Sequence, residues 1–426
     1  MDLPQTADYR RLFLEDTPLL DVRAPVEFAD GAFPAASNLP LVDDAERHAI
    51  GIAYKEAGQD SAVALGHRLV DGAVRAARIA AWQEYARRHP NAVLYCFRGG
   101  MRSLISQQWL AEAGIRMPRV KGGYKALRRF LLEELVTAAR EVRPIVVGGR
   151  TGVGKTRLLE QIPGALDLER LAWHRGSAFG RHATPQPTQI AFENALAIAL
   201  LKHRAAGNPP LVTEDESKHI GARHLPPELY DTLKAAPLLV LEASLEERVE
   251  NTLSAYIEDS LAEHRALFGR TEGFDHWSEQ LLASLDRIRK RLGGARHQEL
   301  RRLMESAIAQ QRRTEDAGLH RGWIAALLAE YYDPMYDYQL APRQPDPGLS
   351  AQPVGADSRR GPVLIRPPCR KRRNPCLRSA WEFNTAIRVP PLRDRAKPHK
   401  LRDTAARLQS GRPARHYNHN HTLEIT

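Results

Sequence analysis

The chain has 426 residues, 62 Lys and Arg against 51 Asp and Glu, and only 3 cysteines. That length allows two or three domains. No apolar leader follows Met1, and no apolar run approaches the ~18 residues of a membrane span. The few cysteines argue against a disulfide framework and show no metal-ligand spacing. We therefore expect a cytoplasmic protein that has no membrane association and no structural metal.

The net charge of +11 suggests a polyanionic partner, but the excess is unevenly distributed. Nearly all of it lies in residues 341–426, a stretch rich in proline and arginine with little hydrophobic periodicity. Residues 1–340 are close to neutral, so a nucleic-acid site there must be a local patch. We expect the stretch 341–426 to be a disordered or aberrant basic tail.

The first 135 residues alternate strand-like and helical patterns. A strand is expected over 18–23, with Asp21 and Arg23 at its carboxyl end, where parallel-sheet proteins place functional groups. Helical spacing of apolar residues follows over 62–70 and 73–85, and a second strand runs into Cys96. The alternation predicts an α/β domain with a parallel sheet over residues 8–135.

The stretch around Cys96 carries the strongest chemical signal. The expected strand 93–95 ends at this cysteine, and a helical pattern opens near Ser103. Glycines let backbone N–H groups point inward, and a helix N-terminus adds positive potential. Together with the two arginines, these groups favour a nucleophilic thiolate and an anion bound beside it. The candidate catalytic residues are Cys96, Arg98, Gly99, Gly100 and Arg102.

Asp21-Val22-Arg23, the stretch from Gly31 to Pro40 and the Cys96 loop resemble the rhodanese family. Rhodaneses carry sulfur or selenium on the loop cysteine, so the resemblance implies a rhodanese-like fold for 8–135. The spacing from Cys96 to Arg102 is C-x5-R, which also fits rhodanese-like phosphatases. A rhodanese-type sulfurtransferase or a C-x5-R phosphatase, fused to a small-molecule kinase, is therefore an alternative.

A helix over 126–141 is expected to bridge to a second α/β domain at 143–245. The apolar strand 144–147 leads into a G-x4-G-K-[ST] motif, and a helical pattern follows it. In that context the motif indicates a P-loop NTPase-like domain, whose backbone N–H groups wrap a phosphate. Thr156 can hold Mg²⁺ there, although no metal site is otherwise expected. The phosphate-binding candidates are Gly149, Gly152, Gly154, Lys155 and Thr156.

Two further segments of this domain contain polar residues that are candidates for supporting the site. Glu214 and Asp215 end a strand and can serve as the acids on the Mg²⁺ side of the phosphate, or they form an acidic turn at a solvated edge. His174 and Arg175 lie in a long aperiodic loop over 167–194. A long loop beside a phosphate site is often functional, although a plain surface excursion is the alternative.

Residues 246–340 read as a helical extension with a basic face over 287–302. Such a face can bind the phosphate backbone of RNA. A charged surface that only faces solvent is an equally good interpretation. Trp173 and several aromatic residues of the extension are available for base stacking. We therefore expect the extension to be a candidate tRNA-binding region.

A rhodanese-like unit followed by a P-loop unit resembles the bacterial tRNA 2-selenouridine synthase family, over about residues 8–340. Shared motifs include the Cys96 loop, Gly122–Lys125, His174–Ser177, Gln186–Gln189, Glu214–Ser217 and Tyr332–Tyr336. The tail has no place in this resemblance, and our hypothesis for it is a shifted reading frame or a replaced terminus. Resequencing the gene tests that hypothesis, and an intact frame contradicts it.

The resemblance implies a transferase that replaces sulfur of 2-thiouridine at the tRNA wobble position with selenium from selenophosphate. It also implies an S-geranyl-2-thiouridine intermediate made with geranyl diphosphate, and no tightly bound cofactor. Cys96 would carry selenium as a selanyl adduct, and the P-loop would hold the diphosphate. The remaining alternative is a non-catalytic RNA-binding scaffold, for which Cys96→Ser would leave function intact.

Overall fold

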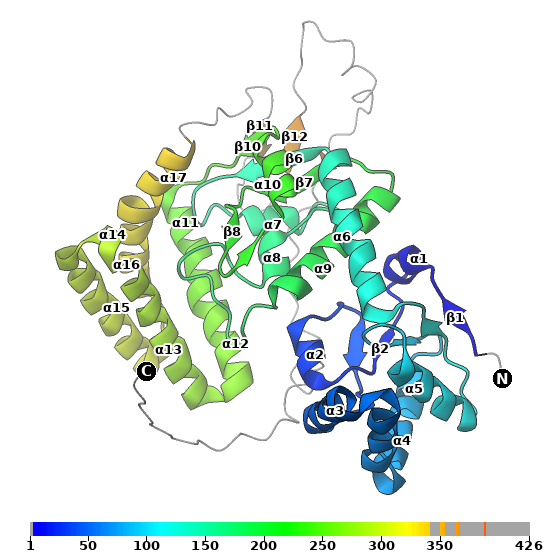
Figure 1. Ribbon diagram of the computed structural model, residues 1–426. Helices are drawn as coiled ribbons and strands as arrows, with labels where there is room; N and C mark the ends of the chain where they lie inside the picture. The colour runs from blue at the N-terminus through cyan, green and yellow to red at the C-terminus, as the bar shows by residue number, and fades with distance from the viewer. Residues whose placement is uncertain (1–2, 341–349, 354–362, 367–386, 389–426) are drawn as a thin grey trace, which may run out of the picture.

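The structure is a computed structural model that describes residues 3–340, 350–353, 363–366 and 387–388 (Figure 1). An all-parallel sheet in the order β1-β5-β4-β2-β3 forms the N-terminal unit, residues 3–141. Its strands are β1 (Gln5–Thr6), β2 (Leu19–Asp21), β3 (Ala36–Asn38), β4 (Val93–Tyr95) and β5 (Arg119–Val120). Its shorter helices are α1 (Tyr9–Leu14), α2 (Pro25–Asp30) and α5 (Met101–Glu112). The predicted α/β class with a parallel sheet is confirmed.

Two helices, α3 (Asp44–Leu69) and α4 (Gly72–Arg88), fill the long connection between β3 and β4. Helix α3 begins well before the predicted residue 62, because Asp43 and Glu46 form a capping box at its N-terminus. It is interrupted at Gly58, whose φ of 80° is not helical. The first half has a largely exposed surface without an apolar stripe, so periodicity alone gives no signal there.

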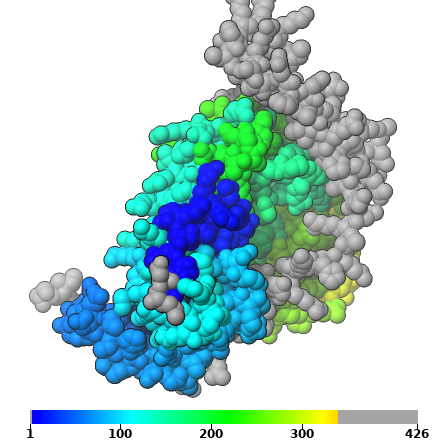
Figure 2. Space-filling view, turned by 90° about the vertical axis from the view of Figure 1, so that its right-hand side faces the viewer, coloured from blue at the N-terminus to red at the C-terminus, as the bar shows by residue number. Residues whose placement is uncertain are grey.

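Helix α6 (Gly123–Glu141) joins the N-terminal unit to the C-terminal unit, residues 142–340. Its apolar stripe, including Leu127 and Leu131, is buried in one continuous core with Phe192 and Leu196 of α9 (Gln189–Ala205). Figure 2 shows the start of the chain in dark blue lying directly against the C-terminal unit, in agreement with the contact between α1 and α9. The bridging helix is therefore part of a shared core rather than a free linker.

The C-terminal unit is built on a parallel sheet in the order β10-β6-β7. Its strands are β6 (Pro144–Gly148), β7 (Leu211–Glu214) and β10 (Leu238–Val240), and β8 (His219–Ile220) pairs antiparallel with β9 (Arg223–His224). The helices around the sheet, besides α9, are α7 (Lys155–Leu159), α8 (Leu168–Ala172) and α10 (Pro227–Lys234). Strand β6 therefore lies at the centre and delivers the glycine-rich loop at its carboxyl end.

A helical layer completes the C-terminal unit beside this sheet, on the left in Figure 1. It has its own core, in which Trp277, Leu300 and Trp323 are buried. Its elements are α11 (Leu245–Thr252), the π-helix η1 (Leu253–Glu258), α12 (Asp259–Phe268), α13 (Arg270–Arg287), α14 (Arg289–Leu292), α15 (Gly294–Thr314), α16 (His320–Leu327), the π-helix η2 (Leu328–Tyr332) and α17 (Asp333–Leu340). The helical character expected for residues 246–340 is present throughout this layer.

Three short strands are described within residues 341–426: β11 (Ser350–Pro353), β12 (Val363–Arg366) and β13 (Ile387–Arg388). They pair antiparallel in the order β11-β12-β13. The predicted disorder of the rest of this stretch lies outside the described residues. In the part of the chain that the structure describes, no helix is long and apolar enough to span a lipid bilayer.

Candidate active site

Cys96 follows β4 directly and lies at the N-terminal end of α5, with 2% of its surface exposed. Its Sγ lies 3.1 Å from Oγ of Ser103, in the first turn of α5. That hydroxyl donates to the carbonyl oxygen of Gly100 at 3.0 Å, and it can rotate to donate to an ionised sulfur instead. The sulfur therefore lies beside the first turn of α5, where its contacts are the Ser103 hydroxyl and, at 4.0 Å, the carbonyl oxygen of Gly100.

Glycines hold the Cys96 loop against the start of α6. Gly99 and Gly123 have φ of 67° and 58°. A Cβ on Gly123 would lie 2.3 Å from the carbonyl oxygen of Cys96, and a Cβ on Gly99 would lie 2.8 Å from the amide nitrogen of Gly122. The amide of Tyr124 donates to that same Cys96 oxygen at 2.8 Å. The Gly122-Gly123-Tyr124 motif thus fixes the backbone of the cysteine loop.

The two arginines of the loop have different environments. Arg102 makes a bidentate pair with Glu27 of α2, at 2.5 and 3.0 Å. Burial disfavours its charge, but this hydrogen-bonded carboxylate and the nearby Cys96 raise the pKa of Arg102. Arg98 is exposed, and no carboxylate among the described residues pairs with it. Arg98 is therefore the cation of the loop that can turn toward an incoming anion.

Asp21 and Arg23 form a buried ion pair, with side chains 0% and 1% exposed and 2.7 Å between Oδ2 and Nη2. Arg23 also donates to the carbonyl oxygen of Gly31 at 2.8 Å and lies over the ring of Tyr124, 3.9 Å from its centroid. The pair ties the end of β2 to the loop that follows α2 and to the start of α6. The two residues therefore hold the backbone around the site, and their role as supporting residues stays a prediction.

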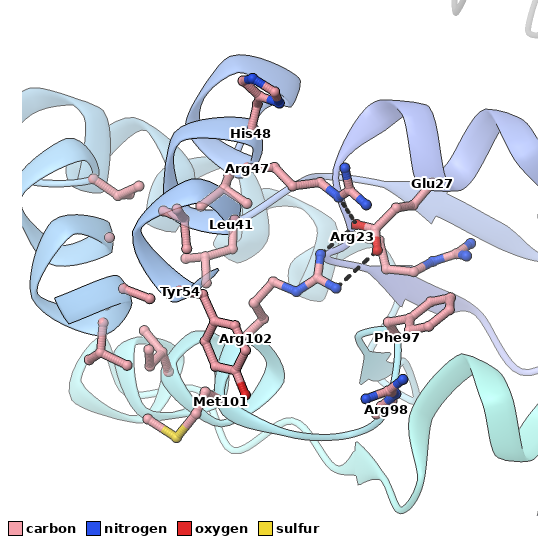
Figure 3. A pocket seen from close by; sticks show the side chains of 18 of the residues that line it. Arg23, Glu27, Leu41, Arg47, His48, Tyr54, Phe97, Arg98, Met101 and Arg102 are labelled. Carbon is pink, nitrogen blue, oxygen red and sulfur yellow. Dashed lines mark hydrogen bonds and ion pairs between the residues drawn. The ribbon is translucent and has the colours of Figure 1, made fainter. Parts of the chain in front are cut away.

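A cavity of about 1100 Å³ is lined by residues that follow Cys96, namely Phe97, Arg98, Met101 and Arg102, and by residues of α2 and α3. Figure 3 shows Arg102, Arg47 and Glu27 gathered on one side of it, with Leu41, Tyr54 and Met101 further round the wall. All of its lining residues come from the N-terminal unit, between Arg23 and Tyr124. The glycine-rich loop of the C-terminal unit is not part of this cavity.

The glycine-rich loop after β6 has the backbone of a phosphate cradle. Gly149, Gly152 and Gly154 have φ of 146°, 83° and 93°. Lys155 begins α7, and its Nζ donates to the carbonyl oxygen of Gly149 at 3.0 Å. Thr156 follows in the first turn of α7. The predicted phosphate-binding residues therefore lie together at the carboxyl end of the central strand.

Residues far along the chain hold this loop in place. Arg248 of α11 donates from Nε to the carbonyl oxygen of Thr151 at 2.9 Å. Asp333 of α17 holds the guanidinium of Arg248 at 3.0 and 2.5 Å, and the Arg248 side chain is only 4% exposed. Asn251 donates to the Gly152 oxygen at 2.9 Å. The helical layer therefore serves as a brace for the phosphate loop, a role that the sequence did not predict.

Glu214 and Asp215 are already engaged by protein groups. Glu214 Oε1 accepts from the amide of Glu169 at 2.7 Å, and burial, reinforced by Asp167, raises its pKa to about 8. Asp215 pairs with Lys234 at 2.8 Å. Among the described residues, no group of three or more His, Cys, Asp or Glu side chains is placed to hold a metal ion. These acids therefore do not by themselves form a metal site among the described residues, and Oε2 of Glu214 is buried without a hydrogen-bond partner.

Glu169 and Glu216 form a second acidic group whose field reaches Lys155. Burial raises the pKa of both, and the charge on Glu169 raises that of Glu216 further. Lys155 opposes the shift on both acids. The hydrogen bond between the two side chains raises the pKa of Glu216 and lowers that of Glu169. The two acids form a dyad whose field is felt at the P-loop lysine.

The long loop after α8 is ordered by contacts with the helical layer. Arg175 and His182 both bind Glu263 of α12. His174 is buried, and burial followed by the charge of His182 lowers its pKa to about 4. Trp173 is 37% exposed with φ of 53°, and its ring stacks on His182 at a centroid distance of 4.1 Å. The loop therefore presents a fixed aromatic surface close to several cations.

Three functional contributors were missed from the sequence: Glu27, the dyad and the Arg248–Asp333 brace. Glu27 has only a weak signal: it stands in the first turn of the short helix α2, where its carboxylate accepts from the amide of Ala24 at 3.0 Å. Glu169 has no motif, and Glu216 was noticed only within an acidic run. Arg248 and Asp333 lie 85 residues apart, and nothing local marks their pairing.

The fold and the two centres define a class of protein: a two-sheet α/β protein with a loop cysteine on one parallel sheet and a phosphate-binding loop on the next. The family model for the tRNA 2-selenouridine synthase AAA domain matches residues 142–352. The tRNA 2-selenouridine synthase of Bordetella petrii is 56% identical over 335 residues, covering 78% of this chain and 90% of the relative.

Two further relatives agree with that match. The tRNA 2-selenouridine synthases of Marinobacter nauticus and Cupriavidus necator are 53% and 54% identical, each over 341 residues, covering 80% of this chain and 93% of each relative. The chain belongs to the tRNA 2-selenouridine synthase family. The resemblance to this family is confirmed, and the resemblance of residues 8–135 to the rhodanese family stays a prediction.

Proposed function

We propose that the two centres of this enzyme act in turn on one tRNA base, the wobble 2-thiouridine. As a member of the tRNA 2-selenouridine synthase family, the chain is an enzyme that transfers selenium to tRNA. The observation that carries the finer proposal is the presence in one chain of a cysteine loop and a braced phosphate loop, on two sheets that share a core. In this proposal the N-terminal unit is a rhodanese-like domain. The protein acts in the cytoplasm, where mature tRNA resides.

The first step is assigned to the P-loop and geranyl diphosphate. The sulfur of 2-thiouridine attacks the first carbon of the geranyl group, a C–S bond forms, and the C–O bond to diphosphate breaks. The base loses its ring N–H proton. Lys155 and the amides of the glycine loop stabilise the charge on the leaving diphosphate. Thr156 would hold Mg²⁺ together with diphosphate oxygens and water, since the nearby acids are engaged elsewhere.

The second step is assigned to Cys96 and selenophosphate. Alkylation makes the sulfur a better leaving group, so that selenium can displace it as geranyl thiol. Overall, one water is consumed and phosphate is released, and selenium enters and leaves the exchange at the selenide level. Holding it in between as a selanyl adduct on Cys96 forms an S–Se bond, which takes a two-electron oxidation by a disulfide, and a thiol reduces that bond again as selenium passes to the base. Arg98 binds the donor's phosphate. Arg102, held by Glu27, stabilises the anion on the sulfur, and the Gly99 and Gly100 segment shapes the loop around it.

Contacts to tRNA are assigned to the loop after α8. Trp173 offers an exposed ring for stacking on an unpaired base, and Arg181 beside it is exposed. The basic face over 287–302 contributes less charge than its sequence suggests. Arg296 pairs with Glu299 and Glu330, and Arg301 pairs with Asp286 and Glu305.

The proposal is tested by expressing the protein in bacteria that lack their own enzyme and supplying selenium. The tRNA is then digested to nucleosides for mass spectrometry. We expect 2-selenouridine, together with S-geranyl-2-thiouridine when selenium is withheld. Soluble protein with neither nucleoside would contradict the proposal. Release of phosphate or thiocyanate without tRNA would instead favour the phosphatase or sulfurtransferase alternative.

A further inference from the structure

The antiparallel hairpin β8–β9 lies next to the phosphate centre but contributes no residue to the phosphate loop. It follows β7 closely along the chain, so it begins at the edge of the sheet where β6 delivers that loop. An isolated two-stranded hairpin is marginally stable at best in water. Contacts with the rest of the unit must therefore hold it in place.

Two glutamines hold the hairpin through its backbone. Gln186 donates to the carbonyl oxygen of Ile220 at 3.0 Å and accepts from the amide of Ala222 at 2.7 Å. Gln189 donates to the carbonyl oxygen of His224 at 2.8 Å and accepts from the amide of the same residue at 3.0 Å. These hydrogen bonds fix the path of the hairpin backbone and leave its exposed side chains available to a partner.

The side chains that the hairpin exposes are basic. Lys218 is exposed, and no carboxylate of the described residues pairs with it. Arg223 is half-buried, and its Nε is buried without a hydrogen-bond partner. His219 and His224 are both exposed beside them, with ring centroids 6.4 Å apart. The hairpin therefore presents fixed cations with unused donors, which suit a phosphate group.

This surface is connected to the Cys96 loop through α9 and α6. Gln189, which holds the hairpin, also donates to Glu193 at 2.9 Å, and Glu193 pairs with Arg128 of α6. One turn earlier on α6, the amide of Lys125 donates to the carbonyl oxygen of Phe97 at 3.0 Å, and its Nζ lies 5.6 Å from the centroid of the Phe97 ring. Lys125 is exposed and has no carboxylate partner in the part of the chain that the structure describes.

We propose that Lys125, Lys218 and Arg223 form a cationic strip that binds backbone phosphates of the tRNA anticodon arm between the two centres. The proposal rests on the proposed function, because it takes one tRNA as the substrate of both centres. Residues 217–224 expose no large apolar side chain, which favours RNA over a protein partner. Phosphate contacts position an RNA without reading its bases, so the wobble base stays free to turn toward either centre.

Binding at a shared strip makes both reactions depend on it in the same way. Each lost cation removes a phosphate contact, and this weakens RNA binding before either chemical step. A residue that served one centre alone would change one reaction and leave the other intact. The strip therefore acts through KM in both reactions, whereas a catalytic residue acts through kcat in one of them.

The test compares full-length wild type with Lys125→Ala, Lys218→Ala and the double variant. The ligand is an anticodon stem-loop RNA with 2-thiouridine or S-geranyl-2-thiouridine at the wobble position, and its Kd is measured over a range of salt concentrations. Arg140→Ala is the control, because Arg140 is an exposed cation of the same helix as Lys125, about 22 Å further along the axis. Circular dichroism melting checks that all variants are folded.

Each single variant should reduce the slope of log Kd against log salt by about 0.7 to 0.9, the value of one lost phosphate contact, and the double variant by about twice as much. For geranylation and selenation alike, kcat/KM should fall by the same factor with kcat little changed. Arg140→Ala should match wild type.

An unchanged slope in either single variant, an equal fall in Arg140→Ala, or a loss confined to one reaction would overturn the proposal. Failure of the proposed function would look different. Wild type would then convert neither RNA, while the salt slopes would still report whether the strip binds the phosphates.

Discussion

The two centres differ in how the chain builds them. The cysteine centre is supported mostly within residues 21–124, by its own strand, its helix and the interlocked glycines of the next helix. The phosphate centre has an equally local motif, but its brace comes from Arg248 and Asp333, about one hundred residues or more away. The comparison shows that all residues of a motif such as the phosphate loop can be present in one short stretch, while the geometry of that loop depends on helices far along the chain.

Among the variants that separate the cysteine centre from the phosphate centre, Cys96→Ala is expected to have the largest effect on activity. The variant removes the nucleophile and leaves the phosphate loop untouched. Selenation should fall by about a thousandfold or more. S-geranyl-2-thiouridine should accumulate instead, and mass spectrometry of digested tRNA measures both nucleosides. Loss of the geranylated nucleoside as well would mean that the centres are not separable.

Lys155→Ala is the counterpart at the phosphate loop. It removes the charge that offsets the leaving diphosphate, so geranylation should fall by about a hundredfold. The same nucleoside analysis, with 2-thiouridine tRNA as substrate, provides the measurement. Arg140→Ala is the control, because it removes an exposed cation from the last turn of α6, which precedes β6 and so lies at the opposite end of that strand from the phosphate loop. A similar loss in both variants would argue against a specific role for the lysine.

The brace itself is broken by Asp333→Ala, which leaves the largely buried Arg248 without its carboxylate. Removing one partner of a buried ion pair costs about 3 kcal/mol, which urea unfolding measures. In the protein that remains folded, geranylation should suffer more than selenation of pre-geranylated tRNA. Glu315→Ala is the control, since it removes a surface carboxylate paired with Arg265 and Arg270. Equal loss of both activities in Asp333→Ala would show that the layer braces the whole molecule.

Gly123→Ala tests the glycine interlock at the other centre. The new Cβ would clash with the Cys96 carbonyl oxygen in a residue with φ of 58°, at a cost of about 2–4 kcal/mol. Gly114→Ala has φ of 84° with nothing within 4 Å, so it carries only the backbone cost of about 1 kcal/mol. Urea unfolding of both variants isolates the clash. Equal destabilisation of the two variants would mean that the Cys96 loop can move away from the new Cβ at little energetic cost.

The smallest effect concerns the pH dependence of stability. The folded pKa of Glu214, about 8, lies above the usual value for a free glutamate, because burial favours the neutral acid. Its contribution to stability is therefore full below about pH 4 and is lost as pH rises to about 8. Glu214→Gln keeps a neutral hydrogen-bond acceptor. Its free energy of unfolding should therefore exceed that of wild type by at least about 1 kcal/mol at pH 9 and by little at pH 4. Urea midpoints at both pH values measure the difference, and a gain that does not change with pH would contradict the assignment.

Much of this fold could be predicted because its signals are local. The strand into Cys96, the glycine-rich loop at Gly149 and the bridging helix near Ala126 all follow from short patterns. The early start of α3 could not, since its first half is charged and lacks an apolar stripe. Glu27 and Asp333 act through partners brought close only by tertiary packing, so their roles required the structure.

The central claim is that the two centres serve one base in succession, and the direct measurement is the selenation of pre-geranylated tRNA by Lys155→Ala. The substrate is tRNA taken from cells that express Cys96→Ala. The account predicts that Lys155→Ala converts this tRNA to 2-selenouridine at close to the wild-type rate, yet leaves 2-thiouridine tRNA unchanged. Failure on the geranylated tRNA, or selenation of the plain thiouridine, would contradict it.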